Sequence, residues 1–219
     1  RGTLLDGAMT LGVAAYLIDW NDVQLEQTDA TRLFRFVGNG GEAEVTGLEF
    51  ELSAKLLDDL TINAGLNFVE AELSADSPLN DAGGLSRTGL SGDLIPDVAD
   101  MTANISAEYG WQVGSEYRAY VLGSYQYTGE SFSDFNEFLI DTNTGIESTT
   151  VNDEYNRQGD YSIVDFKLGI EAGDWNASLF VDNVFNKRAI VQVFEGSFRP
   201  DPGFNFVEKP RTIGVAFSK

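Results

Sequence analysis

The residues best suited to bind a ligand lie in one long polar segment, residues 129–159. This segment interleaves aromatic rings with carboxylates, and its only basic residue is Arg157. Rings set among polar groups can stack on a sugar-like or chelate ligand while nearby oxygens form hydrogen bonds. A solvated loop whose rings pack on neighbouring loops would have the same composition. We predict ligand contacts here at Phe132, Asp134, Phe135, Tyr155 and Arg157.

A second candidate binding segment covers about residues 195–209. It combines several aromatic rings with Arg199, whose guanidinium could hold an anionic group, although a salt bridge within the loop is the alternative. The predicted contacts are Phe198, Arg199 and Phe204. The acidic surplus of the long polar segments argues against a strongly anionic ligand, because like charges repel at short range.

Side chains for catalysis or metal binding are scarce. The chain has no Cys and no His, which excludes thiol chemistry, disulfides, the usual zinc sites and a Ser-His-Asp triad within it. Glu49 and Glu51 form a carboxylate pair, but no other residue suggests a hydrolytic mechanism. Asp141 to Glu147 offers oxygens for Ca²⁺, yet the segment lacks the glycine at the sixth position and the acid at the twelfth position of an EF-hand loop. We predict no enzymatic activity, no cofactor and no resident metal.

The elements that must position these segments are long strands. Residues 161–183 alternate polar and apolar side chains, break once at 172–174 and alternate again, which indicates an antiparallel hairpin with one apolar face. The same period of two recurs along the chain. It predicts eight strands, at about residues 7–26, 43–56, 60–73, 98–110, 116–128, 160–172, 175–194 and 210–217.

The connections between these strands alternate in length. Those at 57–59, 111–115 and 172–174 are short, whereas those at about 27–42, 74–97, 129–159 and 195–209 are long and polar. Short turns on one rim, long loops on the other and strands of more than about ten residues are typical of outer-membrane barrels. The predicted fold class is therefore all-β, an antiparallel up-and-down transmembrane β-barrel in the bacterial outer membrane.

In such a barrel the apolar strand faces contact lipid and the polar faces point to the lumen. The predicted lumen-facing residues are Glu49, Glu51, Glu108, Asp165, Lys167, Glu171 and Asp182. Aromatic residues near the strand ends suit the girdles at the two membrane interfaces; they are Trp20, Tyr109, Trp111, Tyr125, Tyr127 and Trp175.

Charge and hydropathy agree with this interpretation. The 14 basic and 35 acidic residues give a net charge of −21, which argues against a nucleic-acid partner. The mean hydropathy of −0.16 is compatible with a membrane barrel, because only every second strand residue faces lipid. No apolar run approaches the roughly 20 residues that a membrane helix needs.

Five local signatures follow one another along the whole chain. They are Tyr16 to Gln24, Asn39 to Glu51, Gly92 to Pro96 with the strand ending in Tyr109, Val181-Asp182-Asn183-Val184-Phe185-Asn186-Lys187, and Pro210 to Val215. Together they resemble the C-terminal barrel portion of a TonB-dependent outer-membrane receptor. The fourth is similar to the family's Asn-Leu-Phe-Asn-Lys stretch, and the fifth to its final strand.

The resemblance implies that residues 1–219 are the C-terminal part of a barrel of about 22 strands. It also implies a plug domain and a TonB-contacting segment that lie N-terminal in the family and outside this chain. The implied function is energised uptake of a scarce nutrient, namely an iron chelate, cobalamin or an oligosaccharide. The implied partners are outer-membrane lipid, the TonB complex and that small-molecule nutrient. The family ends on an aromatic residue, whereas this chain ends Phe217-Ser218-Lys219.

Two other interpretations fit the same periodicity. A complete eight-stranded barrel, acting as an adhesin or a structural protein, would require the first strand to pair with the eighth. A soluble carbohydrate-binding β-sandwich would bury the apolar stripes between two sheets.

Overall fold

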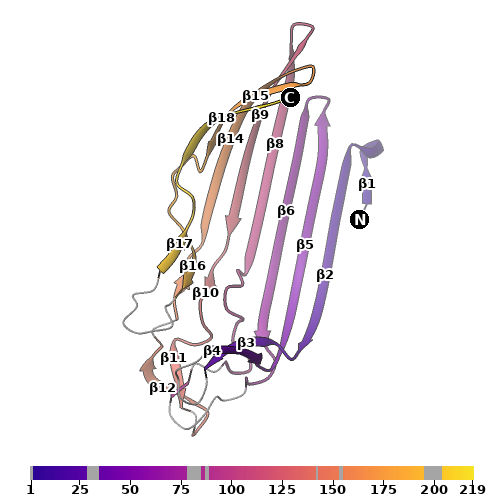
Figure 1. Ribbon diagram of the computed structural model, residues 1–219. Coiled ribbons are helices and arrows are strands. Elements are labelled where there is room, and N and C mark those ends of the chain that lie inside the picture. Colours follow the sequence, from indigo (N-terminus) through magenta and orange to yellow (C-terminus); the bar gives the residue numbers. More distant parts are fainter. Residues whose placement is uncertain are drawn as a thin grey trace.

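The structure is a computed structural model that describes residues 2–28, 35–77, 85–86, 89–141, 143–152, 155–194 and 204–219. Its main feature is one antiparallel sheet in which each strand pairs with the next (Figure 1). The strands of this sheet are β1 (Gly2–Leu4), β2 (Met9–Asn21), β5 (Glu42–Leu57), β6 (Leu60–Leu73), β8 (Met101–Val113), β9 (Tyr117–Thr128), β14 (Tyr161–Ala172), β15 (Trp175–Asp182) and β18 (Thr212–Ser218).

The eight long strands correspond to the eight predicted ones, and β1 adds a short strand at one edge. The predicted all-β, up-and-down fold class is confirmed, because each strand of the sheet pairs with its neighbours in chain order. The period of two in the sequence gives each strand one apolar and one polar face. A 3-10 turn covers Leu5–Gly7. Among the described residues, no helix is long and apolar enough to cross a membrane.

Two predicted strands were too long. The strand expected at 175–194 ends at Asp182, because Asn183 takes a left-handed φ of 51° and turns the chain away; Ile190–Phe194 forms β16 in a separate hairpin. The strand expected at 7–26 ends at Asn21, because Asp22 has a φ of 56°. In both places an Asx residue adopts the conformation that few other side chains tolerate.

Short and long connections lie at opposite ends of the sheet (Figure 1). The hairpins β5–β6, β8–β9 and β14–β15 close the end that we call the hairpin end. The long connections gather at the other, the loop end, and contain short strands of their own. These are β3 (Gln24–Thr28), β4 (Arg35–Asn39), β7 (Leu85–Ser86), β10 (Ser131–Phe132), β11 (Phe138–Asp141), β12 (Ile146–Val151), β13 (Arg157–Gln158), β16 (Ile190–Phe194) and β17 (Phe204–Val207).

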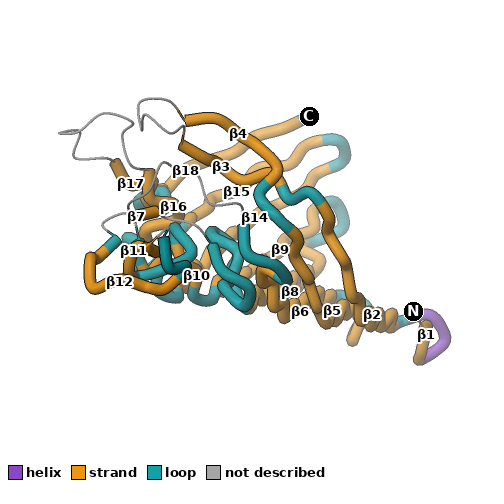
Figure 2. Tube along the Cα trace, turned by 90° about the horizontal axis from the view of Figure 1, so that it is seen from below, coloured by secondary structure: helices purple, strands orange, loops and turns teal. Residues whose placement is uncertain are grey.

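The sheet is curved when viewed from the loop end (Figure 2), and its two faces differ in chemistry. One face, which we call the apolar face, leaves large side chains open: Leu179 is 57% exposed, Ile213 73% and Val215 74%. The other, the polar face, carries Glu49, Asn67 and Thr102 in direct cross-strand register.

This arrangement disagrees with the two alternative interpretations of the periodicity, the soluble sandwich and the closed eight-stranded barrel. A soluble sandwich would bury the apolar stripes, yet they are exposed. A closed eight-stranded barrel would pair the first long strand with the last. Within the described residues, β18 pairs with β15 alone, and β2 pairs with β1 and β5.

The tightest apolar packing lies at the loop end. Val23, Ala43 and Leu73 are almost completely buried and pack with Ile95 and Phe135. Ala43 and Leu73 lie at the loop-end termini of β5 and β6, and the other three residues lie in the connections after β2, β6 and β9. The cluster therefore holds the long loops against the end of the sheet.

Candidate functional site

The predicted binding segment 129–159 forms a structured loop on two short strand pairs. Its stem pairs β10 with β13, so that Phe132 lies opposite Arg157. The rings of Phe132 and Tyr155 stack, with centroids 5.3 Å apart and planes 16° from parallel. The Arg157 guanidinium forms an ion pair with Glu130. Three of the five predicted contacts are thus gathered on one stem.

Burial and neighbouring charges set the protonation states of two side chains on this stem, Tyr155 and Arg157. Partial burial raises the pKa of the Tyr155 phenol, and the nearby carboxylates Glu137 and Glu130 raise it further. The hydrogen bond to Glu130 raises the pKa of Arg157. At neutral pH the stem therefore presents a neutral phenol that can donate a hydrogen bond, next to a charge-balanced ion pair.

Asp134 and Phe135 lie beside this stem and make contacts within the loops. The Asp134 carboxylate accepts a hydrogen bond of 2.9 Å from the side-chain amide of Asn152. That amide also donates to the Asn136 carbonyl at 2.8 Å, and Asn152 is only 1% exposed. Phe135 packs on the cluster around Leu73. Sequence reasoning missed Asn152, since one more asparagine in a polar loop carries no periodic signal.

The second predicted segment is described in part. Phe198 and Arg199 lie outside the described residues. Phe204 begins β17 and pairs with Phe194 of β16. These three contacts stay predictions.

The candidate Ca²⁺ segment forms a tight turn between β11 and β12. The Asp141 carboxylate accepts from the backbone N–H of Asn143 at 2.8 Å, and the Asp141 carbonyl accepts from Gly145 N–H at 2.8 Å. Gly145 takes a φ of 68° that suits glycine. In the part of the chain that the structure describes, no three acidic side chains are grouped so that they could hold a metal ion.

Asp93 gives the loop end a pH dependence. Burial raises its pKa above 3.8, against the hydrogen bond of 2.6 Å that its carboxylate accepts from Leu90 N–H. A raised folded-state pKa means that the folded loop binds the proton more tightly, so loop stability falls as pH rises from 3.8 through the folded-state value.

We expect Asp93→Asn to slow proteolysis of loop 74–100 at pH 7 but not at pH 3.5. Equal slowing at both pH values would contradict this.

On the polar face, Arg118 of β9 bridges two predicted lumen-facing carboxylates. Its guanidinium donates to Glu108 at 3.0 Å and to Glu171 at 3.2 Å. The guanidinium lies over Gly110, where any Cβ would collide with it. Sequence reasoning named both carboxylates and missed the arginine, because only the strand register brings them together.

Removing Arg118 should leave Glu108 and Glu171 close together without a cation. We expect Arg118→Ala to lower the free energy of unfolding by about 1–2 kcal/mol, because two partly exposed ion pairs are lost and solvent limits each to roughly 1 kcal/mol. Urea unfolding followed by tryptophan fluorescence would measure it. Adding Glu108→Gln and Glu171→Gln should restore most of the loss, and a triple variant as unstable as Arg118→Ala would contradict the account.

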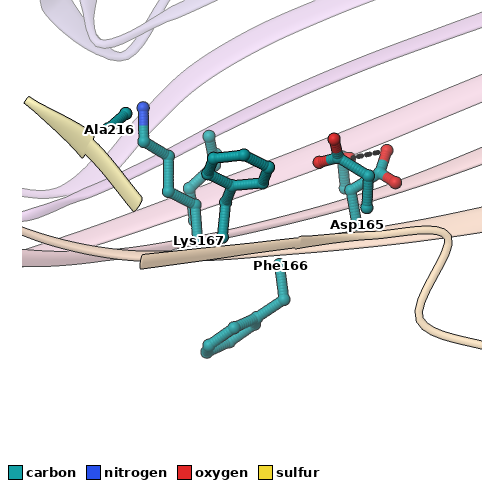
Figure 3. Close-up of a pocket in the computed structure, with 8 residues that line it drawn as sticks. Asp165, Phe166, Lys167 and Ala216 are labelled. Atoms are coloured by element: carbon teal, nitrogen blue, oxygen red, sulfur yellow. Dashed lines mark hydrogen bonds between the residues drawn. The ribbon is translucent and has the colours of Figure 1, made fainter. Parts of the chain in front are cut away.

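The other predicted lumen-facing residues share this face. Figure 3 shows Asp165 and Lys167 on one side of β14 and Phe166 on the other. Asp165 accepts a hydrogen bond of 3.2 Å from the Ser124 hydroxyl, and the Lys167 ammonium lies 5.9 Å from the centre of the Tyr120 ring. Asp165, Lys167 and Asp182 line an open cavity of about 330 Å³ together with Leu122, Ser124 and Phe180.

Comparison with known proteins decides the family. Residues 2–184 match the family model described as the β-barrel of TonB-dependent receptor-like proteins. The chain belongs to the TonB-dependent receptor family. Its resemblance to that family at the sequence level is therefore confirmed, and the family places this receptor chain in the bacterial outer membrane.

Solved structures share the fold of this receptor chain. The ferric yersiniabactin uptake receptor FyuA of Yersinia pestis is 21% identical, with a TM-score of 0.71 over 96% of this chain and 27% of its own. The ferripyoverdine receptor of Pseudomonas aeruginosa is 19% identical, with a TM-score of 0.63 over 99% and 25%. The copper transporter OprC is 14% identical, with a TM-score of 0.62 over 96% and 28%. The chain thus spans about a quarter of the length of these proteins.

The apolar face of this receptor chain carries aromatic residues at the hairpin end, and three of them, Tyr109, Trp111 and Trp175, are among the residues predicted for the girdles. At the hairpin end the rings of Tyr109 and Trp111 stack at 5.9 Å, and those of Trp175 and Phe217 meet at 4.8 Å. Trp20 differs from the prediction, because its register opposite Ala43 places it on the face of Glu49.

On the polar face of the receptor chain, aromatic rings cover glycines of the neighbouring strand. A Cβ added to Gly47 would collide with the ring of Tyr16, and one added to Gly169 with the ring of Tyr120. Phe180 covers Gly214 in the same way. Each ring therefore occupies the space that a side chain at the glycine opposite it would fill.

Proposed function

We propose that this chain is the barrel segment of a TonB-dependent transporter that takes up a scarce nutrient across the outer membrane. The observation that carries the proposal is the division of one curved sheet into an exposed apolar face and a charged polar face, with all long loops at one end. Such a sheet can border lipid on one side and a water-filled or plugged lumen on the other. The loop end would then face the cell exterior.

We propose that residues 1–219 are the C-terminal part of a barrel of about 22 strands, the number found in plugged outer-membrane transporters. The polar face, including Glu49, Glu51, Glu108, Asp165, Lys167 and Asp182, would line the lumen. A plug domain N-terminal to this segment would fill that lumen and contact the TonB complex. Support comes from the family match and from the share of the longer relatives that this chain covers.

The proposed substrate is an iron chelate, cobalamin or an oligosaccharide. Two of the similar structures are named as receptors for ferric yersiniabactin and ferripyoverdine and a third as a copper transporter, which favours a metal chelate. The acidic surplus of the loops favours a neutral or cationic complex over a strongly anionic one.

Uptake by whole cells tests the proposal. The probes are ⁵⁵Fe³⁺ equilibrated with supernatant of iron-starved cultures, ⁵⁷Co-cobalamin and a ¹⁴C-labelled maltodextrin. We expect deletion of the full-length gene to abolish uptake of one probe, deletion of TonB to do the same, and the restored gene to recover it. Unchanged uptake of all three probes in the gene deletion would contradict transport of these substrate classes.

The stacked rings on the loop stem should contribute to capture of that probe. We expect Tyr155→Ala to raise its apparent KM about tenfold with little change in maximal rate, since loss of one well-packed aromatic contact is worth about 1.4 kcal/mol. Val151→Ala on the nearby strand β12, where Val151 is 61% exposed, is the matched control. Equal KM values for the two variants would remove Tyr155 from the predicted site.

A further inference from the structure

Asn183 ends β15 and is one of the most buried polar residues of the structure, with 2% of its surface exposed. Its side-chain amide donates to the carbonyls of Lys187 and Lys209, at 2.9 and 2.7 Å. Its side-chain oxygen accepts from Lys187 N–H at 2.8 Å. Every hydrogen-bonding atom of this side chain is therefore used for backbone that lies outside the main sheet.

The backbone of Asn183 is fixed to the sheet in turn. Its N–H donates to the Asp165 carboxylate at 2.8 Å, and the next residue, Val184, donates to the Val164 carbonyl at 2.8 Å. The second oxygen of Asp165 accepts from Ser124 of β9. Asp165 thus ties the turn to two neighbouring strands, and it does so from the polar face shown in Figure 3.

These bonds reach both ends of the last long connection. One end is the turn 183–187, and the other is the segment 209–211 that leads into β18. A further bond joins them, because the Asn186 side chain accepts from Arg211 N–H at 3.0 Å. The hairpin of β16 and β17 is the described structure between these two ends.

We infer that Asn183, held by Asp165, is the anchor that fixes both ends of this last long connection to the barrel wall, and that it positions the hairpin of β16 and β17 for ligand capture. The capture step rests on the proposed function, whereas the anchoring does not. Asparagine is required because one side chain must donate twice and accept once, while its backbone keeps a left-handed φ of 51°. Aspartate would lose the two donors, and glycine would keep only the backbone.

The anchoring can be measured with a nitroxide label in the full-length receptor. The chain has no cysteine, so one introduced at Val191 on β16, which is 38% exposed, gives a single attachment point within it. A second label at Ile146, in the β11–β12 hairpin and 66% exposed, is the control. Any cysteine elsewhere in the receptor would be replaced by serine.

We expect Asn183→Ala, Asn183→Asp and Asn183→Gly each to shorten the rotational correlation time of the Val191 label about threefold, into the range of mobile loops. The Ile146 label should not change. Asp165→Asn keeps an acceptor for the Asn183 N–H and should behave like the parent, whereas Asp165→Ala should mobilise the Val191 label. An immobile Val191 label in Asn183→Asp, or equal loosening of both labels, would overturn the anchor.

The capture step is tested in the same variants with the probe identified by the uptake assay. We expect Asn183→Asp to raise the apparent KM for this probe while the maximal uptake rate stays within about twofold. A loss of loop positioning weakens capture but leaves the translocation step unchanged. A mobile Val191 label with an unchanged KM would overturn the role in capture and leave the anchor standing. The label measurement needs no transport, so it would stand even if the proposed function failed.

Discussion

Arginine in place of Ile105 is expected to cost the barrel about 2–4 kcal/mol of stability, the penalty for a basic residue near the middle of the lipid-facing surface. Ile105 lies near the middle of β8 on the apolar face and is 46% exposed. The guanidinium of an arginine at this position would have to stay in hydrocarbon or distort the bilayer around it.

The neighbouring residue provides the control. Asn104 lies one position away at nearly the same depth, but the alternation of β8 turns it to the polar face, opposite Gly65 and Gln126. We expect Asn104→Arg to change the stability by less than about 1 kcal/mol. Urea titration of the full receptor folded into short-chain phosphatidylcholine vesicles would measure both variants. Equal losses would mean that the two faces do not border different solvents.

The second large effect is expected at Gly169, where the ring of Tyr120 lies against the backbone. Gly169→Ala should cost about 1–3 kcal/mol, because the added methyl must push the ring aside in a packed site. That shift would also break the 3.3 Å hydrogen bond from the Tyr120 hydroxyl to Asn176.

Gly123 is the matched control for this substitution. It lies in β9, next to the strand of Gly169, and nothing would come within 4 Å of an added Cβ. Gly123→Ala should be neutral or stabilise the barrel by up to about 1 kcal/mol, since alanine restricts the unfolded chain. In a Tyr120→Ala background the cost of Gly169→Ala should largely disappear. A cost that persists there would show that the ring is not its cause.

The strands were predictable because each carries a signal that repeats. Residues such as Leu48, Phe50 and Leu52 alternate with Glu49 and Glu51, and that pattern fixes both the strand and its two faces. The small hairpins of the loop end have no such signal. Strands of two residues, such as β10 and β13, form only because their neighbours hold them in place.

The candidate site was predictable by residue type but not by contact. The sequence indicated that Phe132 and Tyr155 belong to one aromatic loop, and the structure stacks their rings. It could not indicate that Phe135 packs on Leu73, because the two lie far apart in the chain. Arg118 and Asn183 were missed for the same reason, since their partners become neighbours only when the strands and loops come together.

The register of the sheet runs almost without interruption from β2 to β18, and its one irregularity within the sheet lies beside the hairpin turn at Lys55 and Leu57. A single residue inserted inside a long strand would therefore move every following side chain of that strand from the apolar to the polar face or the reverse. The same insertion in a loop shifts no face. The wall of this receptor chain can therefore vary by substitution alone, whereas its long loops can also lengthen and shorten. Under the proposed function, these loops are where new ligand preferences would arise.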